Sequence, residues 1–62
     1  MFKLEIKTGG AAFCDPMTGE HDEYFEIKEI CHILRKIEQD IWNEGNGSCV
    51  DINGNVVGRW SR

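Results

Sequence analysis

The longest stretch of regularly spaced apolar residues lies between Asp22 and Gly45. On a helix of about 100° per residue, most apolar side chains of residues 23–44 fall within one stripe. The stripe contains Ile27, Ile30, Cys31, Leu34, Ile37 and Ile41, with Ile33 at one margin and Trp42 at the other. This pattern predicts one long amphipathic helix that packs on a sheet.

Both ends of this segment carry the signals of helix termini. Asp22 can cap the first turn, and Glu23 and Glu26 stand where the helix dipole favours acids. Gly45 can take the left-handed position after the last turn. Glu38 is the exception, because it falls inside the apolar stripe. We expect Glu38 either to reach Arg35, Arg59 or a basic residue of a second subunit, or to reach solvent where the helix end overhangs the sheet.

Strand patterns occupy the two ends of the chain. Phe2, Leu4 and Ile6 alternate with charged residues, which predicts a strand with one buried and one solvated face. Residues 11–13 are expected to resume extended structure. Residues 14–19 contain Asp-Pro and Thr-Gly pairs, which are typical of a loop.

The C-terminal part predicts a β-hairpin. Asn53-Gly54 separates two segments rich in β-forming residues, and this pair favours a tight turn. Two registers are open: a two-residue loop pairs Val50 with Val57, whereas a three-residue loop with a bulge pairs Val50 with Val56.

The expected order of elements is therefore β-α-β-β, in a single small α+β domain of residues 1–62. Because sequential elements favour short, uncrossed connections, we expect a three-stranded antiparallel sheet with the first strand beside the last. The helix should lie across one face of this sheet. The predicted core contains Phe2, Leu4, Ile6, Phe13, Ile27, Ile30, Leu34, Ile37, Ile41, Val50 and Val57.

The composition of the chain restricts the classes of partner that it could bind. A net charge of −4 on 62 residues argues against generic binding to nucleic acid, which depends on clustered Lys and Arg. We expect a protein partner, and a homodimer would supply burial that so short a chain lacks. No apolar run is long enough to span a membrane and no secretion signal is recognisable, so we expect a cytoplasmic protein with no membrane association. The three cysteines, an odd number, are expected to be reduced thiols.

No residue set predicts a cofactor, a metal site or an enzyme. The His and Cys residues lack the paired spacing of closed zinc sites, and a calcium loop from Asp51 would need Gly at 56 and Glu at 62. Val56 and Arg62 stand there instead. Cys14 and His21 share a loop, but a nucleophile and base would still need a third group and a pocket. The thiols and imidazoles considered are Cys14, His21, Cys31, His32 and Cys49.

Several short motifs resemble a family of small proteins of unknown function found in phages, prophages and bacterial mobile elements. The motifs are Ala11-Ala12-Phe13, Ile33-Leu34-Arg35, Asp51-Ile52-Asn53-Gly54-Asn55, Val57-Gly58 and Trp60. The resemblance implies a phage or prophage-like origin and no catalytic residue. Glu38 departs from the family, in which a small residue is usual at this position.

Two functions follow as hypotheses. The first is a non-catalytic protein-interaction module whose candidate surface comprises Ile33, Trp42, Glu38 and Trp60. The second is an acidic effector that occupies a basic site on a nucleic-acid-handling protein by charge mimicry. Its charge comes from Asp15, Glu20, Asp22, Glu23 and Glu26. Binding that weakens steeply with salt would favour the second hypothesis.

A third hypothesis uses a sheet face that binds single-stranded nucleic acid. Lys3, Lys7 and Arg59 could line such a face, and Trp60 could stack on bases. The chain has too few basic residues for this function, so nucleic acid is not an expected partner.

Overall fold

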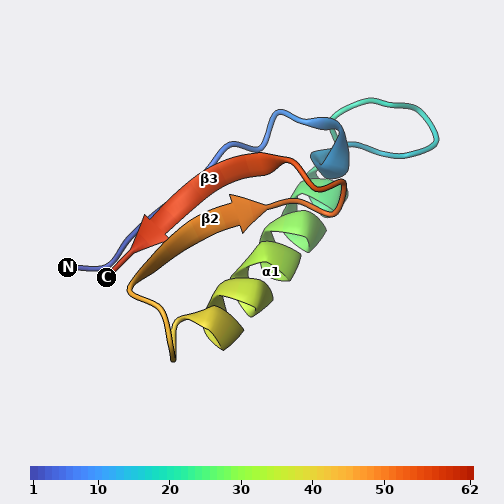
Figure 1. Cartoon of the computed structure of the whole chain (residues 1–62). Helices are drawn as coiled ribbons and strands as arrows, with labels where there is room; N and C mark the ends of the chain where they lie inside the picture. Colours follow the sequence, from blue (N-terminus) through green and yellow to red (C-terminus); the bar gives the residue numbers. More distant parts are fainter.

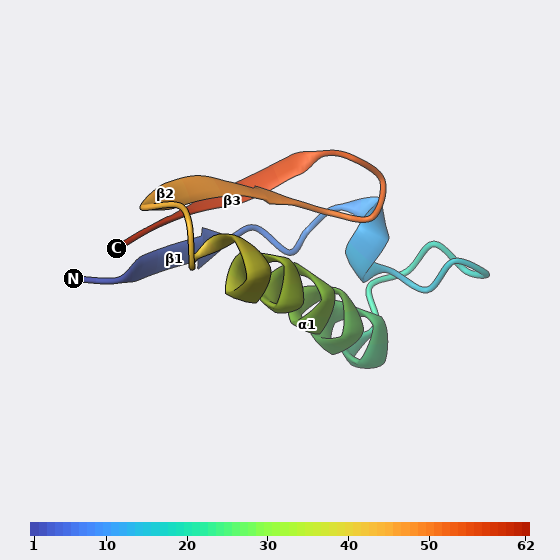
Figure 2. The ribbon, with the colours of Figure 1, turned by 60° about the horizontal axis from the view of Figure 1, so that its bottom comes forward.

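The computed structural model describes all 62 residues and contains one long helix, three strands and one short helical turn (Figure 1). The elements are β1 (Lys3–Ile6), the 3-10 helix η1 (Ala11–Phe13), α1 (Glu23–Asp40), β2 (Asn46–Val50) and β3 (Val56–Ser61). The strands form one antiparallel sheet in the order β1-β3-β2, and α1 lies on one of its faces (Figure 2). The predicted α+β fold, with the first strand beside the last, is confirmed.

The central strand β3 determines which side chains of the sheet meet α1. Leu4 of β1 and Gly47 of β2 both lie opposite Trp60. Residues directly opposite one another share a face, so these three residues are on the helix side of the sheet. β1 and β3 approach closely at Gly58, where a Cβ atom would overlap the carbonyl oxygen of Glu5.

The hairpin between β2 and β3 has the second of the two predicted registers. Val50 pairs with Val56, and the register shifts at the end of β2. Asp51 organises the turn, because one oxygen of its carboxylate accepts the backbone N–H groups of Asn53 and Asn55, each at 2.9 Å. Asp51 is therefore buried with its hydrogen bonds satisfied rather than directed at a ligand.

Helix α1 begins at Glu23, directly after the predicted cap Asp22, and ends earlier than the apolar pattern predicts. Asp22 caps it, and its carboxylate accepts the backbone N–H of Tyr24 at 2.9 Å. The regular helix ends at Asp40 instead of Glu44, and Gly45 does not take the predicted left-handed conformation. The chain must reverse direction to enter β2 within a few residues, and turns replace the last helical residues.

The prediction of extended structure at residues 11–13 is wrong. Phe13 donates its backbone N–H to Gly10 and Cys14 donates to Ala11, both at 3.1 Å, which are the short-range bonds of a 3-10 turn. The turn places the aromatic ring of Phe13 against the core, where it has no solvent exposure. Phe13 therefore fills the core as predicted, but from η1.

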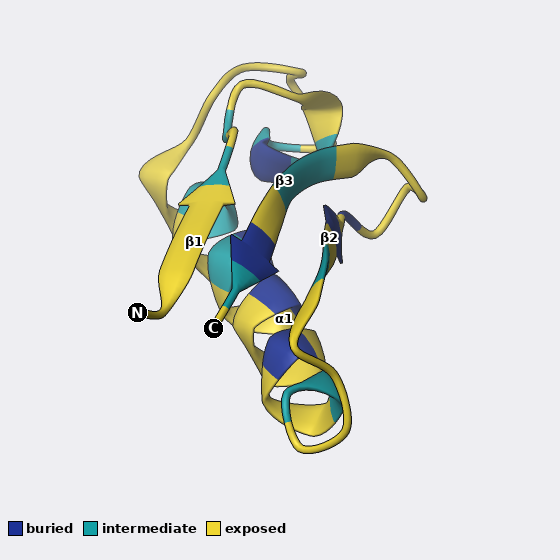
Figure 3. Cartoon of the chain, turned by 60° about the vertical axis from the view of Figure 1, so that its left-hand side comes forward, coloured by how far each residue is buried: buried dark blue, intermediate teal, exposed yellow.

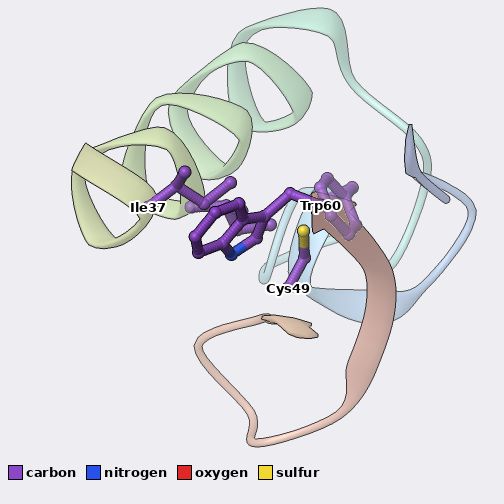
Figure 4. Packing of buried hydrophobic residues seen from close by; sticks show 5 residues of the cluster. Ile37, Cys49 and Trp60 are labelled. Atoms are coloured by element: carbon purple, nitrogen blue, oxygen red, sulfur yellow. The ribbon is translucent and has the colours of Figure 1, made fainter. Parts of the chain in front are cut away.

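The fully formed core is small. It consists of Phe13, Ile33, Ile37, Cys49 and Trp60, each at most 6% exposed. Figure 4 shows Trp60 directed from the sheet toward Ile37 of α1, with Cys49 of β2 beside it. The indole lies over Gly47, where a Cβ atom would stand 2.7 Å from its Nε1. Glycine at position 47 thus gives the indole its room.

The buried face of α1 differs from the predicted stripe. Ile33, predicted at the margin, is 1% exposed, whereas Leu34 and Ile27, predicted at the centre, are 42% and 51% exposed. The buried row follows the i, i+4 spacing of Glu29, Ile33 and Ile37. The helix is therefore rotated about its axis relative to the face that apolar periodicity selects.

The predicted core is correct only in part. Phe13 and Ile37 are buried, and Ile6, Ile30, Ile41 and Val57 are partly buried against the core. Five predicted members are instead 37–51% exposed: Phe2, Leu4, Ile27, Leu34 and Val50. The cause is the position of α1, which packs mainly against η1 and β2. Figure 3 shows β1 with almost no buried surface at the opposite edge of the sheet.

Replacing adjacent helix residues tests this rotation. Ile33→Ala should reduce the free energy of unfolding by about 2–5 kcal/mol, because it leaves a cavity in the core. Leu34→Ala should cost less than half as much, since its side chain is 42% exposed. Urea unfolding followed by circular dichroism, at a concentration where the chain is monomeric, measures both. A larger loss for Leu34→Ala would contradict the observed helix face.

Candidate interaction surface

A group of exposed apolar side chains lies on the side of the molecule where α1 leaves β1 uncovered. Leu4 of β1 and Phe2, which precedes the strand, are 37% and 49% exposed on the helix side of the sheet. The ring of Phe2 still contacts that of Trp60, with a centroid separation of 6.4 Å. Ile27 and Leu34 are exposed on the helix itself. We call these four residues, Phe2, Leu4, Ile27 and Leu34, the open face.

The two flanks of α1 have different surroundings, and these show which flank of the helix carries the exposed apolar residues. Glu29 contacts the β2–β3 turn, since its carboxylate accepts the backbone N–H of Ile52 at 2.8 Å. At about 100° per residue, Ile27 and Leu34 lie on nearly the opposite flank from Glu29. The buried row of Ile33 and Ile37 lies between Glu29 and this flank, so Ile27 and Leu34 are on the side of the helix away from the turn.

The sequence-predicted surface residues fall into two groups. Ile33 and Trp60, 1% and 3% exposed, lie in the core and cannot contact a partner. Trp42 is 81% exposed just beyond the C-terminus of α1. Glu38 is exposed and makes no ion pair within the chain, so it is solvated rather than buried in the helix face. The burial of Trp60 also removes the stacking platform of the nucleic-acid hypothesis.

The free edge of β1 borders the open face. β1 is an outer strand of the sheet, so one side of its backbone has no partner strand. Lys7 donates its backbone N–H to Val57 at 2.7 Å, and hydrogen-bonded pairs alternate along antiparallel strands. The backbone groups of Phe2, Leu4 and Ile6 therefore point away from β3. These residues combine unpaired backbone groups with apolar side chains on the helix side.

The outer face of the sheet is polar and forms an open groove of about 740 Å³. Lys3, Glu5, Lys7 and Arg59 line it, all exposed. Glu5 lies directly opposite Arg59 across the two strands. This face carries charges of both signs and is chemically distinct from the open face.

A second hollow of about 570 Å³ lies between η1, α1 and the β2–β3 turn. Lys28, His32 and Arg35 of α1 line it together with Glu29. The carboxylate of Glu29 already accepts the backbone N–H of Ile52. The hollow therefore has basic side chains along α1 but no unpaired buried polar side-chain atom.

The acidic segment between residues 15 and 26 is engaged mainly in local structure. Asp15 accepts the backbone N–H of Met17 at 2.8 Å, and Asp22 caps α1. Glu26 pairs with Nε2 of His21 at 2.8 Å. This hydrogen bond, together with a smaller contribution from Thr8, lowers the pKa of Glu26 below its ordinary value. Three of the five acids thus stabilise the loop and helix start.

The thiols and imidazoles do not form a catalytic or metal-binding cluster. Cys14 and His21 face each other in an isolated antiparallel bridge, but the Cys14 thiol donates to the Gly10 carbonyl at 3.5 Å. No group of three His, Cys, Asp or Glu side chains is placed to hold a metal ion. Cys49 lies in the core, and burial raises the pKa of its thiol. Cys31 is exposed on α1.

The apolar pattern of the sequence did not identify Glu29 and Asp51, the two buried carboxylates. Each is 5% exposed, and each accepts backbone N–H groups of the β2–β3 turn. The Asp51–Asn53 spacing is typical of a side-chain-capped turn and could have indicated the role of Asp51. No local sequence signal indicates the role of Glu29, because Glu29 and Ile52 are far apart in the chain.

Comparison with known protein families, with curated proteins and with solved structures gives no match for this chain. None of its helices combines the length and the apolar character that crossing a bilayer requires. The surfaces themselves are therefore the basis for any functional proposal.

The two carboxylates of α1 with contrasting surroundings provide a test of the turn anchor. Glu29→Ala should destabilise the fold by about 1–3 kcal/mol, because the Ile52 N–H loses its acceptor in a partly buried place. Glu38→Ala is the matched control and should change stability by less than about 0.5 kcal/mol, as expected of an exposed site. Thermal unfolding monitored by circular dichroism compares them. Equal losses for the two variants would contradict the anchoring role of Glu29.

Proposed function

We propose that this chain is a small, non-catalytic protein-interaction module that binds a protein partner through the open face. The observation that carries the proposal is the exposure of Phe2 and Leu4 beside a free strand edge and of Ile27 and Leu34 on α1, in a chain with only seven buried residues. Contiguous exposed apolar surface bordered by polar residues is typical of protein-binding sites. Trp42, just beyond the C-terminus of α1, is a further exposed apolar side chain.

The energetic scale is sufficient for a specific contact. Burying a large apolar side chain completely contributes about 1.5–3 kcal/mol. The four open-face side chains are roughly half exposed, so covering them would contribute about 3–6 kcal/mol in total. A free strand edge beside them can add backbone hydrogen bonds to a partner.

Charge mimicry has less support than the interaction module. Asp15, Asp22 and Glu26 accept hydrogen bonds that hold the loop and the helix start, so their side chains have a structural role in the chain itself. All five carboxylates keep their charge, but five acids are few for a mimic of a phosphate backbone and salt screens their field over about 8 Å. The interaction module depends on apolar contacts, which salt does not weaken.

The proposal includes no catalytic step, cofactor or metal, and it does not depend on nucleic acid. Three free cysteines, one of them exposed, suit the reducing conditions of the cytoplasm, where we expect the module to act. The resemblance to small phage and prophage proteins is compatible with this role and assigns no activity.

Affinity capture with matched variants tests the open face. The bait is the tagged chain, offered to host extract supplemented with a differently tagged copy of itself. Leu34→Arg should lower retention of the bound protein by about tenfold or more, because the interface would have to bury an unpaired charge. Gln39→Arg introduces the same residue on an exposed polar flank and should retain the partner.

Retention should change little between low and physiological salt. Equal retention by the two arginine variants would contradict binding through the open face. Loss of retention with salt in both variants would favour the acidic-effector alternative.

A further inference from the structure

We infer that the occupant of the open face is a second copy of this chain, joined through antiparallel pairing of the two β1 edges about a two-fold axis that passes between the two Leu4 residues. This inference rests on the proposed interaction function and names its partner. It follows from three features that the fold brings together along the β1 edge: unpaired backbone groups, self-complementary charges on the outer face and uncovered apolar side chains on the helix side.

The first feature is the direction of the backbone hydrogen-bonding groups. Phe2, Leu4 and Ile6 direct their N–H and C=O groups away from β3, as the Lys7–Val57 hydrogen bond fixes the alternation. A second β1 strand can form a regular antiparallel ladder only by pairing these same residues. Leu4 can therefore face Phe2, Leu4 or Ile6 of the partner.

The second feature selects one of these registers by charge. When Leu4 faces Leu4 of the other copy, Lys3 lies opposite Glu5 twice, so unlike charges meet. A shift that sets Leu4 opposite Ile6 places Glu5 opposite Glu5 and Lys3 opposite Lys7. The reverse shift places Lys3 opposite Lys3. Only the Leu4–Leu4 register avoids like charges directly across the strands.

The same register matches apolar side chains on the helix side. Phe2 lies opposite Ile6 of the other copy, and the two Leu4 side chains meet at the axis. These residues face the side of the sheet that carries α1, so the two helices flank the new seam. Ile27 and Leu34 of each helix stay exposed apart from this seam unless the second copy reaches them.

The surface area of the single chain is consistent with a missing partner. It exposes 4745 Å², whereas a compact monomer of this mass exposes about 4,100 Å². The projecting loop at residues 14–21 contributes to the excess, and so do the apolar side chains of β1 and α1. A standard protein interface buries about 800 Å² per partner, which is comparable with this excess.

Charge reversal tests the register directly by sedimentation equilibrium. Wild-type chain should sediment as a dimer in the micromolar range. Lys3→Glu and Glu5→Lys each turn both unlike pairs into like pairs, so each variant alone should dimerise at least about tenfold more weakly. An equimolar mixture of the two variants restores unlike pairs in a heterodimer and should recover the wild-type affinity.

The mixture also controls for folding, because an unfolded variant could not rescue the other. Circular dichroism of each variant alone should match the wild type, as both positions are exposed. A wild type that stays monomeric throughout the range would overturn the inference. A wild-type dimer unaffected by either charge reversal, or a mixture that fails to recover, would overturn it as well.

The outcomes separate this inference from the proposed function. If the wild type is monomeric but Leu34→Arg still abolishes capture of a different protein, the second copy is the wrong partner and the interaction function stands. If the wild type is monomeric and the open-face variant changes no binding, both fail.

Discussion

The packing of the Trp60 indole determines where the helix lies on the sheet. Trp60 occupies the central strand and is 3% exposed, and its ring lies over Gly47 of β2 because no side chain stands there. Ile33 and Ile37 belong to the same buried cluster as this ring, so α1 follows it toward the β2 side. A residue with a Cβ atom at position 47 would displace the indole. The contact between one tryptophan and one glycine thus leaves the opposite edge strand without a cover.

Polar contacts hold the end of the hairpin in the same arrangement. Glu29 reaches from α1 to the backbone of Ile52, and Asp51 closes the turn from within. Buried carboxylates are tolerated only when their oxygens accept hydrogen bonds, and no buried side-chain polar atom is left unpaired. The helix is therefore fixed on β2 by an apolar contact at Trp60 and by a charged acceptor at Glu29. With the helix held by these two contacts, Ile27 and Leu34 lie outside the core.

Local signals in the sequence were sufficient to predict the helix, the strands and their order along the chain. Asp22 caps α1, and Asn53-Gly54 lies in the hairpin turn, because both depend on residues close in the chain. The helix face was predicted wrongly because the apolar residues of α1 span more of the circumference than the sheet covers. Apolar periodicity centres on Leu34, whereas the contact between Glu29 and a residue 23 positions away favours Ile33. Such a choice depends on tertiary packing and not on periodicity.

Prediction of the candidate surface from the sequence failed in part because it needed the same long-range information. Glu38 on α1 and Trp42 just beyond it are exposed, but Ile33 and Trp60 lie in the core. The position of Trp60 follows from its pairing with Gly47 and Leu4, which required the sheet order and register. The period-two pattern of Phe2, Leu4 and Ile6 predicted a buried strand face, but Phe2 and Leu4 are exposed. It could not indicate that this face would stay open.

The central claim is that β1 is an edge whose outward backbone groups pair with another copy. Amide hydrogen exchange of β1, measured by nuclear magnetic resonance at several protein concentrations, tests it most directly. The Leu4 amide should exchange rapidly in dilute protein and become protected as concentration rises. The Glu5 amide, directed toward β3, should be protected throughout. Exchange of the Leu4 amide at a rate independent of concentration would contradict the account.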